Sequence, residues 1–281
     1  MLKPRLSWIP VRLMPAIMFD KTMTTEQWLE DAKYKFDLPA VEMYFGFMRD
    51  FEPDYTRHIA SELKRLGLEV SQLCTSTDFT HPNSEVRKAQ REYLKRAIVA
   101  ANTIGAPAIR FVTGQRHPGV TDDQGIEWVL SGLEEVISFA EPYGVEIRLE
   151  NHFRDRSVWE LPDFAQKPEV FFKLYERIGH LPVMINFDCS NALMCDEDPV
   201  EILNVVKDRV VSIHASDRKR GSYQHSIIGE GDVPFDSIFR ILSEAGFSGW
   251  ISAEDGNPHG DEGFAKSLAF LRSKIDEYWQ S

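Results

Sequence analysis

Ile147-Arg148-Leu149-Glu150 is the first of four similar segments in the second half of the chain; the others are Ile185-Asn186-Phe187-Asp188, Val211-Ser212-Ile213-His214 and Ile251-Ser252-Ala253-Glu254. Each segment alternates apolar and polar residues and ends on a side chain that can bind a metal ion. Because strand side chains alternate between two faces, each segment predicts a strand with one apolar and one polar face. Four such strands in succession predict a parallel barrel that gathers the four terminal side chains at its carboxyl end.

The rest of the chain extends this prediction. Strand-like runs lie near residues 5–9, 40–44, 69–74, 107–112, 145–150, 183–188, 210–214 and 249–254. Helix-like segments follow them, near residues 25–35, 54–66, 85–104, 122–141, 168–178, 199–206, 235–245 and 263–278. Eight strands that alternate with eight helices predict an α/β fold, the (β/α)8 or TIM barrel. We expect residues 1–281 to form one such domain.

Composition restricts the partners. The formal net charge of −12 argues against a nucleic-acid partner, which would need a positive surface. Prolines interrupt the first 15 residues before any run long enough for a membrane span or a signal segment. The cysteines are odd in number and lack paired spacing, which indicates a reducing compartment; they are Cys74, Cys189 and Cys195. We therefore expect a cytoplasmic protein with no membrane partner.

The four strand-end side chains suit a metal ion. A lone acidic residue or histidine at a strand end is usually structural. Four of them, in phase on consecutive strands, predict one shared site instead. Three carboxylates, one imidazole and no thiolate favour Mn²⁺, with Mg²⁺, Co²⁺ and Zn²⁺ as alternatives. The predicted ligands are Glu150, Asp188, His214 and Glu254.

Over nearly its whole length the chain resembles the sugar isomerase/epimerase superfamily of xylose isomerase-like TIM barrels. The residues that carry this resemblance are Leu149-Glu150-Asn151-His152, Asn186-Phe187-Asp188, His214-Ala215-Ser216-Asp217, Gly229-Glu230-Gly231-Asp232-Val233-Pro234-Phe235 and Gly249-Trp250-Ile251-Ser252-Ala253-Glu254. The resemblance implies that these four ligands bind one divalent metal, and that Glu150 and Glu254 also move protons. It implies a small sugar or sugar-like substrate and a homo-oligomer. The chain departs from many relatives at Asn191, where they carry a histidine; we expect Asn191 to contact substrate in its place.

The ligand chemistry predicts proton transfer. A metal with open positions can polarise a keto-sugar and stabilise the enediolate that forms when the α-proton leaves. Glu150 and Glu254 come from non-neighbouring strands and could flank both faces of this intermediate, which gives epimerisation. Proton return to the adjacent carbon gives isomerisation. Loss of a β-leaving group gives a lyase, either a dehydratase or a keto-glycoside eliminase, as the alternative. A phosphodiesterase of the endonuclease IV type is less favoured, because the histidines are scattered and the charge is negative.

Three long loops are expected to carry substrate contacts, at residues 114–121, 151–167 and 215–234. His152 is predicted as a catalytic acid or base, or else as a loop hydrogen-bonding group. Arg218 could bind a substrate oxygen, or belong to an exposed run of cations. His225 fits a lid contact or an outer neighbour of the metal site, or else a solvated loop residue.

Two further sets of residues have a structural alternative. Arg110 and Arg148 are expected to pair inside the barrel with carboxylates such as Glu42. An apolar wall for a sugar ring is predicted from Trp8, a substrate-binding candidate, with Tyr44, Phe111 and Phe153; the alternative is that these aromatic residues belong to the core.

Overall fold

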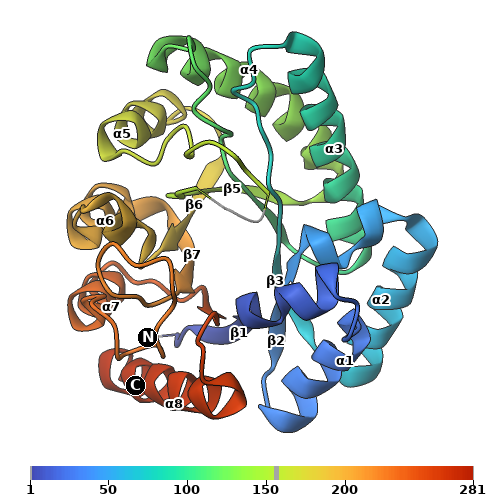
Figure 1. Cartoon of the computed structure of the whole chain (residues 1–281), viewed down its shortest axis with the longest axis vertical. Coiled ribbons are helices and arrows are strands. Elements are labelled where there is room, and N and C mark those ends of the chain that lie inside the picture. Colours follow the sequence, from blue (N-terminus) through green and yellow to red (C-terminus); the bar gives the residue numbers. More distant parts are fainter. Residues whose placement is uncertain (1, 155–157, 281) are drawn as a thin grey trace.

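The computed structural model describes residues 2–154 and 158–280. Eight parallel strands form the inner ring and helices surround it (Figure 1), so the prediction of a (β/α)8 barrel is confirmed. The strands are β1 Arg5–Ile9, β2 Ala40–Tyr44, β3 Glu69–Cys74, β4 Ala108–Phe111, β5 Glu146–Glu150, β6 Val183–Asp188, β7 Val210–Ala215 and β8 Trp250–Glu254. The main helices are α1 Thr25–Glu30, α2 Pro53–Leu66, α3 Ser84–Thr103, α4 Asp122–Ala140, α5 Pro168–Arg177, α6 Pro199–Val206, α7 Phe235–Glu244 and α8 Gly260–Tyr278.

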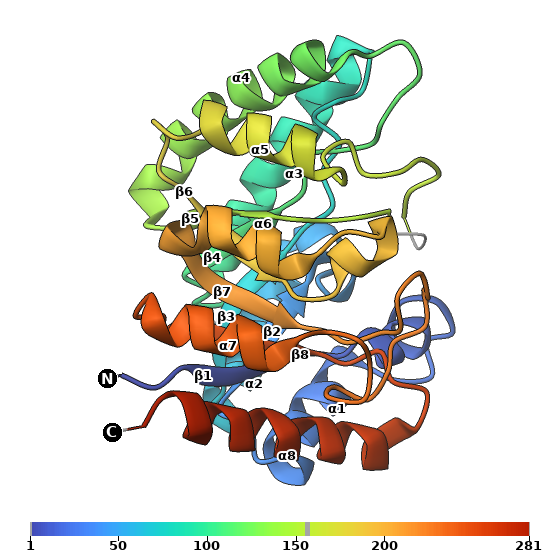
Figure 2. The same ribbon diagram turned by 90° about the vertical axis from the view of Figure 1, so that its left-hand side faces the viewer.

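The strands pair in the order β1-β8-β7-β6-β5-β4-β3-β2. β1 and β2 lie side by side and complete the ring, although their described residues form no regular ladder. All strands run in the same direction, so the loops that follow them gather at one end of the barrel, opposite both chain termini (Figure 2). No helix among the described residues is long and apolar enough to cross a membrane.

Local sequence fixes where several helices begin. Thr24 and Thr121 each cap a helix, and the glutamine three residues later returns a hydrogen bond to the capping residue. This reciprocal pair satisfies two backbone N–H groups that a helix start would leave unpaired. Pro53, Pro168 and Pro199 occupy the first helical position, where a missing N–H costs nothing.

A polar network fills the middle of the barrel. Gln72 Nε2 donates to Asn186 Oδ1 at 2.9 Å, and Ser212 Oγ donates to the same oxygen at 2.7 Å. Arg148 Nη1 donates to Gln72 Oε1 at 3.1 Å, and Arg148 Nε to Glu146 at 2.6 Å. Arg148 therefore lies inside the barrel beside a carboxylate, as expected. Because the buried members of this network hydrogen-bond to one another, they form a polar layer under the strand ends.

The register between β2 and β3 shifts at Glu42. On either side of the shift the paired residues are Val41 with Val70 and Met43 with Leu73. One residue of β2, Glu42, therefore lies opposite two residues of β3, Ser71 and Gln72. An extra residue of this kind bends a strand and redirects its side chains, and such bulges are common next to active sites. Beyond the shift, Cys74 of β3 points toward Glu42 and donates to its Oε1.

The prediction that Trp8 lines the substrate site is wrong. Trp8 is fully buried on the outer side of β1, where its ring stacks on Phe264 with centroids 4.5 Å apart. The rings of Trp28 and Phe36 meet it edge-on. Alternation along β1 turns Ile9 toward the barrel axis and Trp8 toward the helices. Phe111 is likewise fully buried in the core.

This placement makes Trp8 a stability residue. We expect Trp8→Ala to lower the free energy of unfolding by about 3–5 kcal/mol, because it removes a large, tightly packed ring. Metal affinity of the folded variant should stay within about twofold of wild type, since Trp8 is outside the candidate site. Urea unfolding and metal titration test this, with Tyr34→Ala, at an exposed aromatic, as control. A stable variant with weakened metal binding would contradict the placement.

Candidate metal centre and cavity

The four predicted metal ligands meet at the carboxyl ends of β5 to β8. His214 Nδ1 lies 3.0 Å from Glu254 Oε2, 3.5 Å from Glu150 Oε2 and 3.9 Å from Asp188 Oδ2. Ligand atoms of Glu150, Asp188 and His214 all lie within 4.8 Å of one another. These three are buried, whereas the Glu254 side chain is 16% exposed. The arrangement concentrates three carboxylates around one imidazole nitrogen.

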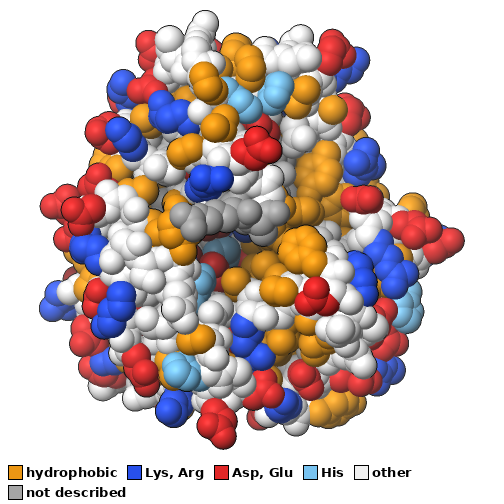
Figure 3. Space-filling model, viewed as in Figure 1, with side chains coloured by type: hydrophobic (Ala, Val, Ile, Leu, Met, Phe, Trp, Pro, Cys, Tyr) orange, Lys and Arg blue, Asp and Glu red, His pale blue; other side chains and the backbone are white. Residues whose placement is uncertain are grey.

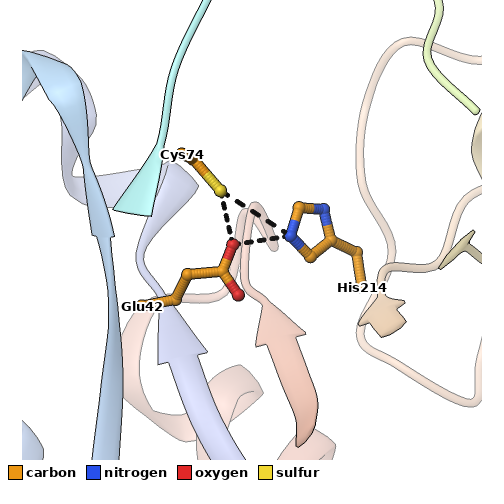
Figure 4. Close-up of side chains that lie close together, drawn as sticks. All are labelled: Glu42, Cys74 and His214. Carbon is orange, nitrogen blue, oxygen red and sulfur yellow. Dashed lines mark hydrogen bonds and ion pairs between the residues drawn. The ribbon is translucent and has the colours of Figure 1, made fainter. Parts of the chain in front are cut away.

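The orientation of His214 tests whether this group suits a metal. Its Nδ1 is buried and makes no hydrogen bond to any described residue, although three carboxylates surround it. Its Nε2 lies 2.6 Å from Glu42 Oε1 (Figure 4). Burial would raise the pKa of Glu42, but the charge and hydrogen bond of His214 lower it, so Glu42 accepts the Nε2 proton. Nδ1 is then directed at the carboxylates, where a divalent cation could take the place of a proton.

Cys74 completes the group behind His214. Its Sγ donates to Glu42 Oε1 at 2.6 Å (Figure 4). Burial raises the pKa of the Cys74 thiol to about 12, so the thiol keeps its proton. Glu42, Cys74 and His214 are close enough to hold a metal themselves. A protonated thiol is a poor ligand, so we assign these residues to the support of His214 instead.

The charges of the cluster oppose one another when no metal is bound. Burial, then the charges of Glu254 and Glu150, raise the pKa of Asp188 to about 8. Burial alone would lower the pKa of His214, but the charges of Glu42 and Glu150 raise it well above its usual value. Burial would raise the pKa of Glu150, but Arg110 and His214 lower it to about 2. Protons on Asp188 and His214 thus compete with a metal ion.

We therefore expect metal affinity to rise from about pH 6 to about pH 9, with release of protons on binding. For Asp188 the folded pKa lies above the unfolded value of about 3.9, so its proton stabilises the metal-free fold at low pH. That contribution is lost as the pH rises through 8, so the metal-free melting temperature should fall. His214 acts in the same direction. Calorimetry in buffers of different ionisation enthalpy counts the protons; pH-independent affinity would contradict this.

Arg110 and Asn191 hold Glu150 from two sides. Arg110 Nε lies 2.8 Å from Glu150 Oε2, and its Nη1 donates to the carbonyl oxygen of Thr75 at 2.7 Å. Arg110 therefore pairs with a carboxylate inside the barrel, as expected, and that carboxylate is Glu150. Asn191 Nδ2 donates to Glu150 Oε1 at 3.1 Å, and its backbone N–H donates to Asp188 Oδ1 at 2.6 Å. Asn191 thus contacts two predicted ligands as well as the cavity.

A cavity of about 340 Å³ opens above the cluster. Figure 3 shows it as the hollow in the middle of the face, with hydrophobic side chains on part of its rim. Its floor contains most of the predicted site residues, namely Glu150, His152, Asn191, Arg218, His225 and Glu254, beside Arg110. The other lining residues are Ile9, Val11, Met14, Pro15, Phe19, Tyr44, Phe153, Arg154 and Tyr223.

His152 is oriented by an aspartate that the sequence did not reveal. His152 Nδ1 lies 3.2 Å from Asp163 Oδ2, and Asp163 also accepts from Thr113 Oγ1 at 3.1 Å. Burial would lower the pKa of His152, but the bond to Asp163 and the charge of Glu150 raise it. His152 therefore makes a loop hydrogen bond and lines the cavity at the same time. Residues 155–157 of the predicted loop 151–167 lie outside the described residues.

Arg218 is buried, so the alternative of an exposed cation run does not hold for it. Its Nε donates to Ser190 Oγ at 2.8 Å and its Nη2 to His225 Nε2 at 3.1 Å. Its Nη1 is buried without a hydrogen bond to any described residue. Because arginine only donates, His225 accepts as a neutral ring. Burial and the charge of Arg218 lower the pKa of His225 to about 4.

Asp217, which sequence reasoning did not select, fixes the loop after β7. Its carboxylate accepts the backbone N–H groups of Gly229, Gly231 and Val233 at 2.8, 2.8 and 3.2 Å. A Cβ atom at Gly231 would lie 1.9 Å from Asp217 Oδ1, so the close approach requires glycine. These hydrogen bonds account for the position of the Gly229-Glu230-Gly231 turn, and they hold the loop that carries Arg218 and His225 over the cavity.

The family model of the xylose isomerase-like TIM barrel matches residues 31–274, and the chain belongs to this family. The "Uncharacterized protein MJ1311" of Methanocaldococcus jannaschii is 28% identical over 184 residues, which are 62% of this chain and 59% of that protein. The L-ribulose-5-phosphate 3-epimerase UlaE of Salmonella paratyphi C is 23% identical over 207 residues, which are 71% of this chain and 69% of the epimerase.

Solved structures show the same fold. An IolI protein with a bound zinc atom superimposes with a TM-score of 0.77 at 15% identity, over 99% of this chain and 100% of that one. The 3-keto-D-glucoside 4-epimerase YcjR of E. coli has a TM-score of 0.74 at 18% identity, over 96% of this chain and 100% of that one. The family is therefore settled by sequence and the barrel by structure.

Proposed function

We propose that the protein is a divalent-metal-dependent isomerase or epimerase of a keto-sugar. The observation that carries this proposal is the cluster itself, in which Glu150 and Glu254 both lie at the floor of one cavity, close to His214 Nδ1, and this nitrogen makes no hydrogen bond to a described residue. The epimerases among the similar proteins support it. Glu150, Asp188, His214 and Glu254 would hold the metal, with Mn²⁺ as the first choice. When bound, a divalent ion supplies the positive charge that polarises a carbonyl oxygen and its neighbouring hydroxyl oxygen.

The protein side chains move the proton. The two candidate bases are Glu150 and Glu254. Arg110 and Asn191 hold Glu150 in place, and Glu254 is open to the cavity. One carboxylate removes the proton next to the carbonyl, and the other returns a proton to the opposite face of the same carbon, which inverts it. Return to the adjacent carbon gives isomerisation. Arg218 Nη1, which is buried and hydrogen-bonds no described residue, would donate to a substrate oxygen and so fix the reacting carbon.

A lyase is the second candidate, and the pair of His152 and Asp163 favours it. Asp163 turns the imidazole of His152 toward the cavity and raises its pKa. A protonated histidine at this place can give its proton to the oxygen that leaves from the β-carbon. The same α-proton abstraction by a carboxylate would precede this step.

Metal content and solvent exchange test the proposal together. We expect about one equivalent of Mn²⁺ or a similar ion in the wild-type protein and a clear loss in Glu254→Gln, because one of four ligands is weakened. In D₂O, wild type should place deuterium next to the carbonyl of ketoses or keto-glycosides, and Glu254→Gln should not. Glu244→Gln, at an exposed helix position, is the matched control. Product analysis then separates isomerase from lyase. No metal, or several zinc ions, would overturn the single-site mechanism.

A further inference from the structure

The cavity changes character from its floor to its opening. Charged groups line the floor, whereas the opening, here called the apolar mouth, is built from Val11, Met14, Pro15, Phe19, Phe153 and Tyr223. The first four belong to the two short turns Val11–Leu13 and Pro15–Phe19 and their junction after β1. Phe153 and Tyr223 come from the loops after β5 and β7, and their rings lie 5.7 Å apart. Three separate loops thus bring apolar side chains to one opening.

Two aromatic rings of the apolar mouth face solvent. Phe19 is 60% exposed and Tyr223 is 41% exposed. Exposed apolar side chains scattered singly over a surface need no explanation, but these two line the same cavity as the candidate metal ligands. Aromatic side chains with an apolar face and limited freedom are typical anchors for a ring-shaped ligand. The free energy available from covering both rings favours a ligand that reaches the opening.

Size and charge define the kind of ligand. A cavity of about 340 Å³ falls at the lower end of the range for drug-sized ligands, roughly 300–1,000 Å³, and exceeds the need of one sugar ring. Arg110 and Arg218 lie at the floor, where each already bonds a protein group. A phosphate at the opening would depend mainly on Arg154, the other arginine among the described lining residues, because Arg110 and Arg218 lie at the floor.

We propose that the substrate is a keto-sugar glycoside, whose sugar ring binds over the carboxylate cluster and whose aglycone, a second ring, lies against Phe19 and Tyr223. This inference rests on the proposed function, since it takes the sugar ring to react at the cluster. A free ketose would leave the apolar mouth uncovered, and a sugar phosphate would place charge against it. An aryl group and another sugar can each supply the second ring, because both present an apolar face to an aromatic side chain.

The test compares four probes in D₂O with the metal-loaded protein: 3-keto-glucose, phenyl 3-keto-β-glucoside, a 3-keto-disaccharide and a ketose 5-phosphate. We expect kcat/KM for deuterium entry to be about tenfold or more higher for an extended probe than for 3-keto-glucose. Phe19→Ala and Tyr223→Ala should remove this advantage and leave exchange into 3-keto-glucose unchanged. Tyr34→Ala, at an exposed aromatic outside the cavity, is the matched control. A preference for the phenyl or the disaccharide probe identifies the aglycone.

Two results would overturn the inference alone. One is equal exchange into free and extended probes with no effect of Phe19→Ala or Tyr223→Ala; the other is fastest exchange into the phosphate, lost in Arg154→Gln. Exchange into none of the probes would instead count against the proposed function. The aglycone site is then tested without chemistry, by saturation-transfer NMR on unreactive phenyl β-glucoside. Contact of the phenyl protons that disappears in Phe19→Ala supports the inference, and contact that persists overturns it.

Discussion

Glu150→Gln is expected to lower turnover by about 10³-fold or more, because it removes both a candidate base and a metal ligand. It should also destabilise the fold. The Arg110 guanidinium is buried against Glu150, and a buried charge that loses its partner costs about 3–5 kcal/mol. Glu254→Gln should lose a similar share of turnover, yet destabilise the metal-free protein less, since it removes the contact with His214 but also relieves repulsion on Asp188. The two variants thus separate the proton-transfer role from the ion-pair role.

Both quantities can be measured on the same preparations. Deuterium exchange into the best substrate gives the turnover, and urea unfolding of the metal-free proteins gives the stability. A Glu150→Gln protein with activity within about tenfold of wild type would refute its assignment as a base. Equal stability of the two variants would show that Arg110 does not depend on Glu150 for its charge balance.

Glu42→Leu is expected to weaken metal binding by about 10–100-fold without removing any ligand. The substitution leaves His214 Nε2 without its acceptor, so neither the tautomer nor the ring orientation is fixed. Cys74 also loses the oxygen to which its thiol donates. Glu42→Gln should fall between wild type and Glu42→Leu, because its amide oxygen can still accept the Nε2 proton. Cys74→Ala should change the affinity least, since it leaves the bond between Glu42 and His214 in place.

Free Mn²⁺, observed by electron paramagnetic resonance during a titration, gives these affinities directly. The spectrum of bound Mn²⁺ gives a second readout. It responds to the arrangement of the ligands around the ion, which folding of the protein alone does not report. A Glu42→Leu protein that binds Mn²⁺ as tightly as wild type would show that His214 is oriented without Glu42. Thermal unfolding of each metal-free variant separates a loss of affinity from a loss of fold.

The barrel could be predicted because its strands repeat one simple pattern. Residues 183–188 coincide with β6, since alternation is clear and turn residues bound the strand. Alternation along Arg5–Ile9 turns Leu6 and Trp8 outward, to the side of the strand that faces the helices. The sequence therefore did indicate that Trp8 belongs to the core. Placing Trp8 in the substrate site gave too much weight to its position near a strand end.

The parts of the site that could not be predicted come from loops. Asp163 and Asp217 are single acidic residues in segments without periodicity, and nothing in the spacing marks their partners His152 and Gly231. Their roles depend on how long loops fold back over the barrel. The four metal ligands, in contrast, could be predicted. Each ends a strand, and the carboxyl ends of the strands of a parallel barrel lie close together. Glu42 is an intermediate case. Alternation along its strand predicts that its side chain points into the barrel, but nothing in the sequence predicts that it meets His214.

The extra residue of β3 opposite Glu42 has a consequence for how relatives are compared. Alignments of barrel proteins usually place gaps in loops and keep strands ungapped. Here a strand itself carries one residue more than its neighbour requires, and each later residue of that strand would change face if the strand paired without the bulge. A relative of equal strand length but without the bulge would present the residue aligned with Leu73 where this chain presents Cys74, although an ungapped alignment would match the two strands. The roles of Glu42 and Cys74 can therefore be assigned to a relative only when the register of its strands is known. Identical residues at these two alignment positions are not sufficient evidence.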